Sequence, residues 1–175
     1  MHMVDLREKV VQDRGIIARI QRYVPGFSGY RAKEDLRAAD NMLRLQLADR
    51  LAAVRADVEA CRAAAVEGGD IRGLDRFGGL INKFKAVEGQ VRHAGQGYSG
   101  ISAKVRVGEP ELNKLYEYDL GLLTAVAAMG GDAAKLKSVA PADAGDGLQK
   151  LGAALDGFEE TFEKRMQVIT GTEVQ

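Results

Sequence analysis

Histidine and cysteine are the side chains best suited to metal binding or nucleophilic catalysis, and this chain has few of either. It contains one cysteine, Cys61, and two histidines, His2 and His93. Zinc sites need several such ligands, and di-iron helical bundles use Glu-x-x-His, whereas Gln90 stands three residues before His93. We therefore expect no metal site and no cofactor. His93 is expected to cap a helix end, and Cys61 to be a small buried apolar side chain.

Two further patterns associated with catalysis are incomplete. Gly95–Gly100 is rich in glycine, but it lacks the Gly-Lys-Ser/Thr ending of a phosphate-binding loop. The Gly-x-Ser-x-Gly sequence of a nucleophile elbow does not occur. Glu159, Glu160 and Glu163 lie off the apolar seam of the last predicted helix, as expected for a solvated face. We therefore predict no catalytic residue and a protein that is not an enzyme.

An aromatic segment between two predicted helices is the candidate binding site. It reads Tyr23-Val24-Pro25-Gly26-Phe27-Ser28-Gly29-Tyr30. In one interpretation the rings staple a helical hairpin while the glycines supply positive φ angles. In the other, the segment is an exposed tip that anchors a protein partner, because aromatic side chains dominate binding hot spots. The second interpretation makes Tyr23, Pro25, Phe27 and Tyr30 the predicted partner-binding residues.

The element that positions this segment is a predicted long central helix. Tyr30 to Glu67 is a run of 38 residues without glycine or proline. Its apolar residues recur every three or four positions, so we expect a rod of roughly 57 Å. Asp40 and Arg44 are expected to form an i,i+4 ion pair on its outer face. The apolar stripe consists of Leu36, Ala39, Leu43, Leu47, Leu51, Val54, Val58, Cys61 and Ala65.

The sequence predicts four further helices and one short helical turn. A first helix spans about residues 4–24, with Gly15 inside it, and a third spans 74–93. A fourth begins near Pro110 and ends at Gly130-Gly131, followed by a short helical turn at 132–139. The last helix carries a heptad seam, with one step of seven, formed by Leu148, Leu151, Leu155, Phe158, Phe162 and Ile169.

Residues 101–107 alternate between apolar and polar side chains, which is the period of a strand. They are either an extended connector on the bundle or an edge that pairs with another chain. The predicted fold is all-α: an elongated antiparallel bundle of four to five helices around one long central helix. We assign residues 1–175 to one domain and interpret residues 1–3 as a cloning remnant and the start.

Composition and charge exclude several classes of partner. The chain has 25 Lys and Arg and 25 Asp and Glu, so we expect neither nucleic-acid binding nor peripheral membrane contact. No apolar run is long enough for a transmembrane helix, and the charged N-terminal residues do not resemble a secretory leader. The single cysteine fits the cytoplasm, which is the predicted location.

The charge is divided unevenly along the chain. Residues 1–107 carry 19 basic and 13 acidic side chains, whereas residues 108–175 carry 6 and 12. Either the two halves pair across a seam between antiparallel helices, or copies of the chain associate head to tail.

Around the aromatic segment the chain resembles a family of small, uncharacterised prokaryotic helical proteins with no assigned activity. The resemblance covers residues 16–51 and lies in Ile20-x-x-Tyr23-Val24-Pro25-Gly26-Phe27-x-Gly29-Tyr30, Lys33-Glu34 and Arg37-x-x-Asp40. It implies a helical fold and a bacterial or archaeal cytoplasmic origin.

Two functions are therefore predicted. The first is a non-enzymatic interaction or scaffold protein that binds a protein partner or its own copy through its surface. The alternative is a helical bundle that binds a small apolar ligand, in space opened by Gly78-Gly79 beside Phe77 and Phe84.

Overall fold

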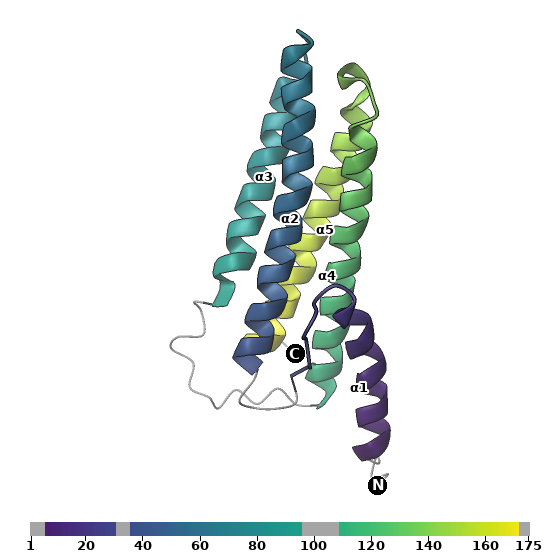
Figure 1. Cartoon of the computed structure of the whole chain (residues 1–175). Coiled ribbons are helices and arrows are strands. Elements are labelled where there is room, and N and C mark those ends of the chain that lie inside the picture. Colours follow the sequence, from purple (N-terminus) through teal and green to yellow (C-terminus); the bar gives the residue numbers. More distant parts are fainter. Residues whose placement is uncertain (1–5, 31–35, 96–108, 172–175) are drawn as a thin grey trace.

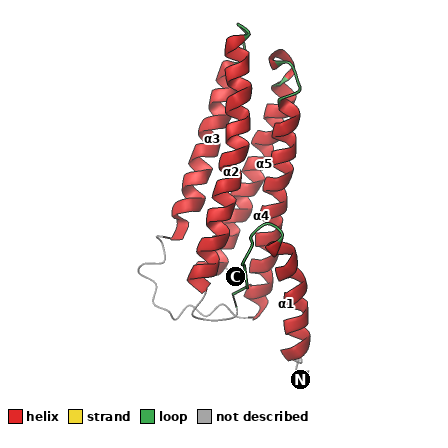
Figure 2. Ribbon diagram, in the orientation of Figure 1, coloured by secondary structure: helices red, strands yellow, loops and turns green. Residues whose placement is uncertain are grey.

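Two antiparallel hairpins of long helices form the body of the protein, and a fifth helix lies outside them (Figure 1). The computed structural model describes residues 6–30, 36–95 and 109–171. Within these ranges the regular elements are helical and no strand is present (Figure 2). The all-α prediction is confirmed. The segment 101–107, expected to be extended, lies outside the described residues.

The helices follow one another as two hairpins. Helix α2 spans Leu36–Glu67 and packs against α3, which spans Leu74–His93. Helix α4 spans Glu109–Leu136 and packs against α5, which spans Gly145–Thr170. A short 3-10 helix, η2, occupies Pro141–Asp143 between α4 and α5. Contacts between α2 and α4 and between α3 and α5 join the hairpins into a four-helix bundle.

Helix α2 is the predicted rod. Its 32 described residues correspond to about 48 Å, and residues 31–35 of the predicted run lie outside the description. Most of the expected stripe is buried, although Leu36 and Cys61 are only partly so. The helix ends in a Schellman motif: Gly69 has a φ of 73°, and the Asp70 amide donates to the Ala65 carbonyl at 2.9 Å. This glycine reverses the chain into α3.

Helix α1 spans Leu6–Gln21 and lies outside the bundle, against α4 (Figure 1). Gly15 lies within it and does not break it, as the sequence predicted. After a turn at residues 22–26, an extended segment leads back toward the beginning of α2. This return brings Tyr30 against α4.

The predicted end of the fourth helix at Gly130-Gly131 is wrong. Helix α4 continues through both glycines to Leu136 and absorbs much of the short turn expected at 132–139. Two glycines cost a helix roughly 2 kcal/mol relative to alanine. Burial of Met129, Ala133 and Leu136 offsets that cost, since each buried apolar side chain stabilises the packed helix.

Ion pairs connect the two hairpins, and the basic residue belongs to the first half of the chain in one pair and to the second half in another. Lys83 of α3 pairs with Asp156 of α5, which is the pairing that the uneven charge distribution predicted. Lys137 and Asp57 pair at 2.5 Å with the opposite polarity, the base coming from the second half of the chain. Pairing across the seam therefore accounts for only part of the asymmetry.

Candidate functional site

The unusual chemistry of this protein lies inside the bundle, where five polar side chains form what we call the buried ionic cluster. Each is at most 4% exposed, and they come from the turn after α1 and from three different helices. The cluster consists of Tyr30, Asp40, Arg44, Asp119 and Arg165. Its two aspartates and two arginines balance in formal charge.

Arg165 of α5 occupies the centre of this cluster. Its Nε donates to Asp119 Oδ1 at 2.6 Å, and its Nη2 donates to the Tyr30 hydroxyl at 3.2 Å. Its Nη1 lies 2.8 Å from Asp40 Oδ1, but the N–H does not point at that oxygen, which accepts no hydrogen bond. Arg165 thus joins α5 to α2, to α4 and to the turn after α1.

Tyr30 connects the N-terminal segment to the same point. Its hydroxyl donates to the Asp119 carboxylate, and its backbone amide donates to the Tyr116 hydroxyl at 3.0 Å. Its ring lies 5.2 Å from the ring of Phe27 in an edge-to-face arrangement. An aromatic side chain with a fully used hydroxyl can be buried at little cost, because both its apolar and its polar parts find partners.

The structure corrects the predicted position of the Asp40–Arg44 ion pair. Arg44 Nε donates to Asp40 Oδ2 at 2.8 Å, so the i,i+4 pair exists, but both side chains are buried and do not lie on the outer face of α2. Arg44 Nη1 also donates to the carbonyls of Val91 and Arg92 at 3.1 Å. These carbonyls belong to the last turn of α3 and lack helical partners, so Arg44 caps that helix from the side.

Burial and neighbouring charges shift the pKa values of three ionisable groups of the cluster. Burial raises the pKa of Asp119 to about 6, although the Arg165 guanidinium opposes this rise. Burial, together with the Asp119 carboxylate, raises the pKa of Tyr30 well above its ordinary value, so the phenol remains a donor. Burial disfavours the charge of Arg165, yet the neighbouring carboxylates raise its pKa well above the ordinary value.

This arrangement holds the fold together and leaves little for chemistry on a substrate. The carboxylates of the cluster face guanidinium groups and a phenol, and every member is shielded from solvent. A charge in such a place is stabilised only while its partners are present. We therefore interpret the cluster as the device that sets the register of α2, α4 and α5 and attaches the N-terminal segment.

The sequence contained signals for two of these residues. The step of seven in the last seam runs from Phe162 to Ile169, and Arg165 occupies the skipped heptad position. In α4 the buried residues Leu112, Leu115, Asp119, Leu122 and Val126 also follow steps of three and four. A charged residue at a seam position indicates a buried charge, and two oppositely charged ones indicate a pair.

The four residues predicted to bind a partner differ in their exposure to solvent. Phe27 and Tyr30 are buried, which contradicts an exposed aromatic tip at these two positions. Tyr23 is partly buried under Arg50, whose guanidinium carbon lies 5.3 Å from its ring centroid, and only Pro25 is exposed. Gly26 and Gly29 have φ angles of 88° and 95°, as expected for a stapled hairpin. Partner binding at Tyr23 and Pro25 stays a prediction.

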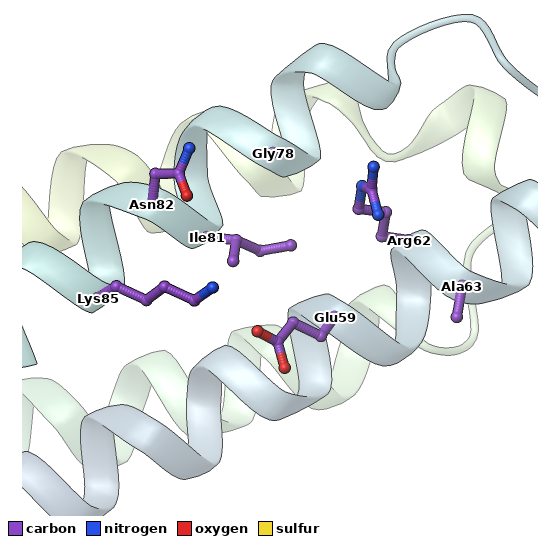
Figure 3. A pocket seen from close by; sticks show the side chains of 7 residues that line it. All are labelled: Glu59, Arg62, Ala63, Gly78, Ile81, Asn82 and Lys85. Atoms are coloured by element: carbon purple, nitrogen blue, oxygen red, sulfur yellow. The ribbon is translucent and has the colours of Figure 1, made fainter.

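A second feature is an open groove of about 460 Å³ between α2 and α3 (Figure 3). Gly78 lies beside it, and a Cβ atom there would meet nothing within 4 Å. The space that the sequence suggested beside Gly78 therefore faces outward, whereas Phe77 and Phe84 are packed in the core. The other lining residues are Glu59, Arg62 and Ala63 of α2 and Ile81, Asn82 and Lys85 of α3.

His93 and Cys61 belong neither to the buried ionic cluster nor to the lining of the groove. His93 is exposed in the last turn of α3. Cys61 is partly buried, and burial raises the pKa of its thiol. Among residues 6–30, 36–95 and 109–171, no three His, Cys, Asp or Glu side chains are placed to hold a metal ion. None of the helices in the same ranges has the length and apolarity that crossing a membrane requires.

Comparison with protein-family models, with curated proteins and with solved structures finds no match. The resemblance of residues 16–51 to a prokaryotic helical family thus remains a prediction.

Proposed function

We propose that this protein is a non-enzymatic helical scaffold protein, located in the cytoplasm, that acts through its surface and associates with a second copy of itself. The carrying observation is that large apolar side chains are left exposed at the two turns at one end of the bundle. We call these residues the apolar tip, and they are Val66, Ile71 and Val139. Ile71 is 74% exposed, the highest value among the large apolar residues described.

The apolar tip is built from two turns. Val66 and Ile71 flank the turn from α2 to α3, and Val139 follows α4. Both turns lie at the end of the bundle far from the described ends of the chain, and η2, next to the second turn, contacts helix α2 (Figure 1). Apolar side chains grouped on an otherwise polar surface mark interaction sites, whereas single ones have no such meaning.

The charges beside Ile71 support a second copy as the partner. Asp70 precedes it and Arg72 follows it, and neither side chain has a partner within the described part of the chain. A twofold interface requires a patch that complements itself. If two tips meet about a twofold axis at Ile71, Asp70 of each copy can face Arg72 of the other while the isoleucines are buried.

Light scattering after size exclusion, over roughly a hundredfold range of concentration, tests this proposal. We expect a dimer whose population rises with concentration and falls in Ile71→Ser. Met42→Ser is the matched control, because Met42 is an exposed apolar residue of α2 outside the tip, and it should leave the dimer unchanged. A monomer at every concentration would contradict self-association.

Charge reversal gives an independent test of the twofold pairing. Asp70→Arg places like charges opposite each other and should weaken the dimer about tenfold or more. The double variant Asp70→Arg/Arg72→Asp restores opposite charges in the reverse order and should recover it. Recovery would support the pairing, and equal weakening in both variants would contradict it.

The groove between α2 and α3 favours a second candidate function, the binding of a small ligand. Four of its seven lining residues have polar or charged side chains, and Ile81 and Ala63 have apolar ones. This composition differs from the apolar interior site expected from Gly78-Gly79.

A further inference from the structure

The lining of the α2–α3 groove carries a net positive charge. Arg62 and Lys85 contribute two positive charges and Glu59 one negative charge. Glu59 already has a partner, because its Oε1 accepts a hydrogen bond from Arg55 Nη1 at 2.8 Å. Arg55 pairs with Glu88 as well, with its Nε 2.6 Å from Glu88 Oε2. The two bases that line the groove are therefore not neutralised by Glu59.

Neither of these two bases is used elsewhere. Within the described part of the chain, Arg62 and Lys85 make no hydrogen bond or ion pair. Most other bases near the α2–α3 face are engaged: Arg55 with Glu88, Lys83 with Asp156, and Arg92 with Asp49 at 3.1 Å. Unlike these three, the two bases that line the groove have no partner in the described part of the chain.

Ile81 gives the groove an apolar surface between its two basic side chains. Ile81 projects into the space between the side chains of Arg62 and Lys85 (Figure 3). Gly78 leaves the end near Arg62 open, because it has no side chain to fill it. A volume of about 460 Å³ lies in the range of small-molecule sites.

We propose that this groove binds a small organic monoanion consisting of a carboxylate joined to a short apolar body. The carboxylate contacts Arg62, whose planar guanidinium matches its two oxygens, and the apolar body lies over Ile81. The two bases and one acid of the lining give it a net formal charge of +1, which a monoanion balances. This inference rests on the second candidate function above and is independent of self-association through the apolar tip.

The experiment is a titration of the full chain with benzoate, followed through the backbone amide resonances of Gly78 and Asn82. We expect saturable shifts with benzoate and much smaller ones with benzyl alcohol, a neutral compound of similar size. Arg62→Gln should weaken benzoate binding about tenfold or more, because a charge-assisted contact is lost. The control Arg19→Gln, which alters an exposed arginine of α1 outside both the groove and the apolar tip, should bind as the unmodified protein does.

A pair of glycine variants separates loss of binding from loss of folding. Gly78→Leu fills the open space, whereas Gly79→Leu alters an exposed neighbour that does not line the groove. Both replace a helical glycine by a better helix former, so neither should unfold the chain. Only Gly78→Leu should abolish the benzoate shifts.

Three results would overturn the proposal: shifts that do not saturate, equal shifts with benzyl alcohol, or unchanged binding in both Arg62→Gln and Gly78→Leu. The oligomeric state measured on the same samples keeps this test separate. If the dimer persists without benzoate binding, only the groove proposal fails. If benzoate binds a protein that is always monomeric, only the self-association proposal fails.

Discussion

Arg165 Nε donates a hydrogen bond to Asp119 Oδ1 at 2.6 Å in a place where neither side chain is exposed to solvent. The two residues are 46 positions apart and lie on the facing helices α4 and α5. A buried pair of this kind contributes less by its attraction than by the penalty that follows when one partner is removed. Variants that remove one partner of the pair therefore test the role of the cluster.

Replacing Arg165 by methionine should destabilise the protein strongly. The variant keeps most of the side-chain volume but leaves Asp119 without its guanidinium partner and Asp40 with Arg44 alone, and we expect a loss of about 3–5 kcal/mol in the free energy of unfolding. Urea unfolding followed by circular dichroism measures it. Lys164→Met, at the exposed neighbouring position, should change stability by less than about 0.5 kcal/mol. Equal effects of the two variants would contradict the central role of Arg165.

Stability should depend on pH through Asp119. Burial raises the pKa of its carboxyl to about 6 in the folded protein, above the ordinary value of 3.8. Between these values the folded state holds a proton that the unfolded chain releases, so the contribution of this group to stability increases as pH falls from 6 to 4. It is lost as pH rises through 6. The full change is roughly 3 kcal/mol.

Asp119→Asn isolates that contribution, because an amide does not titrate. The difference in unfolding free energy between the unmodified protein and Asp119→Asn should change in favour of the unmodified protein as pH falls from 7 to 4. Carboxylates outside the buried ionic cluster act on both proteins alike and cancel in the difference. A difference that does not vary with pH would show that Asp119 titrates normally.

Two glycines of the turn after α1 should respond differently to alanine. Both have positive φ angles, but only at Gly29 would the new Cβ lie 2.6 Å from the Tyr116 hydroxyl. Gly26→Ala should cost about 1 kcal/mol from backbone strain alone. Gly29→Ala should cost at least about 2 kcal/mol more, since it also displaces the hydroxyl that accepts the Tyr30 amide. Equal losses would mean that the segment does not pack on α4 as described.

The continuation of α4 through Gly131 predicts a stabilising substitution. Gly131 is exposed in the helix interior, and a Cβ there would meet nothing within 4 Å. Gly131→Ala should therefore raise the free energy of unfolding by roughly 0.5–1 kcal/mol. If the chain instead turned at Gly130-Gly131, the same substitution would be neutral or destabilising. Thermal unfolding distinguishes the two outcomes.

Helix existence and most helix bounds were predictable from the sequence, because apolar spacing is a local property. The bounds of α3 at Leu74 and His93 agree with the prediction, and the buried stripe of α2 follows the expected positions. The same local reasoning failed at Gly130-Gly131. Two glycines normally end a helix, and only the burial of Met129, Ala133 and Leu136 against the rest of the bundle reverses that preference.

In the candidate sites, too, the local features were predictable from the sequence and the long-range contacts were not. The sequence indicated open space beside Gly78, but in the core and not at the surface, and a stapled turn at Tyr23–Tyr30 was one of its two interpretations. Both follow from local effects of glycine and proline. The sequence could not place the buried ionic cluster, whose hydrogen bonds join Tyr30 to Asp119 across 89 positions and to Arg165 across 135. A polar side chain is normally solvated, and only the tertiary structure decides whether distant partners allow it to be buried.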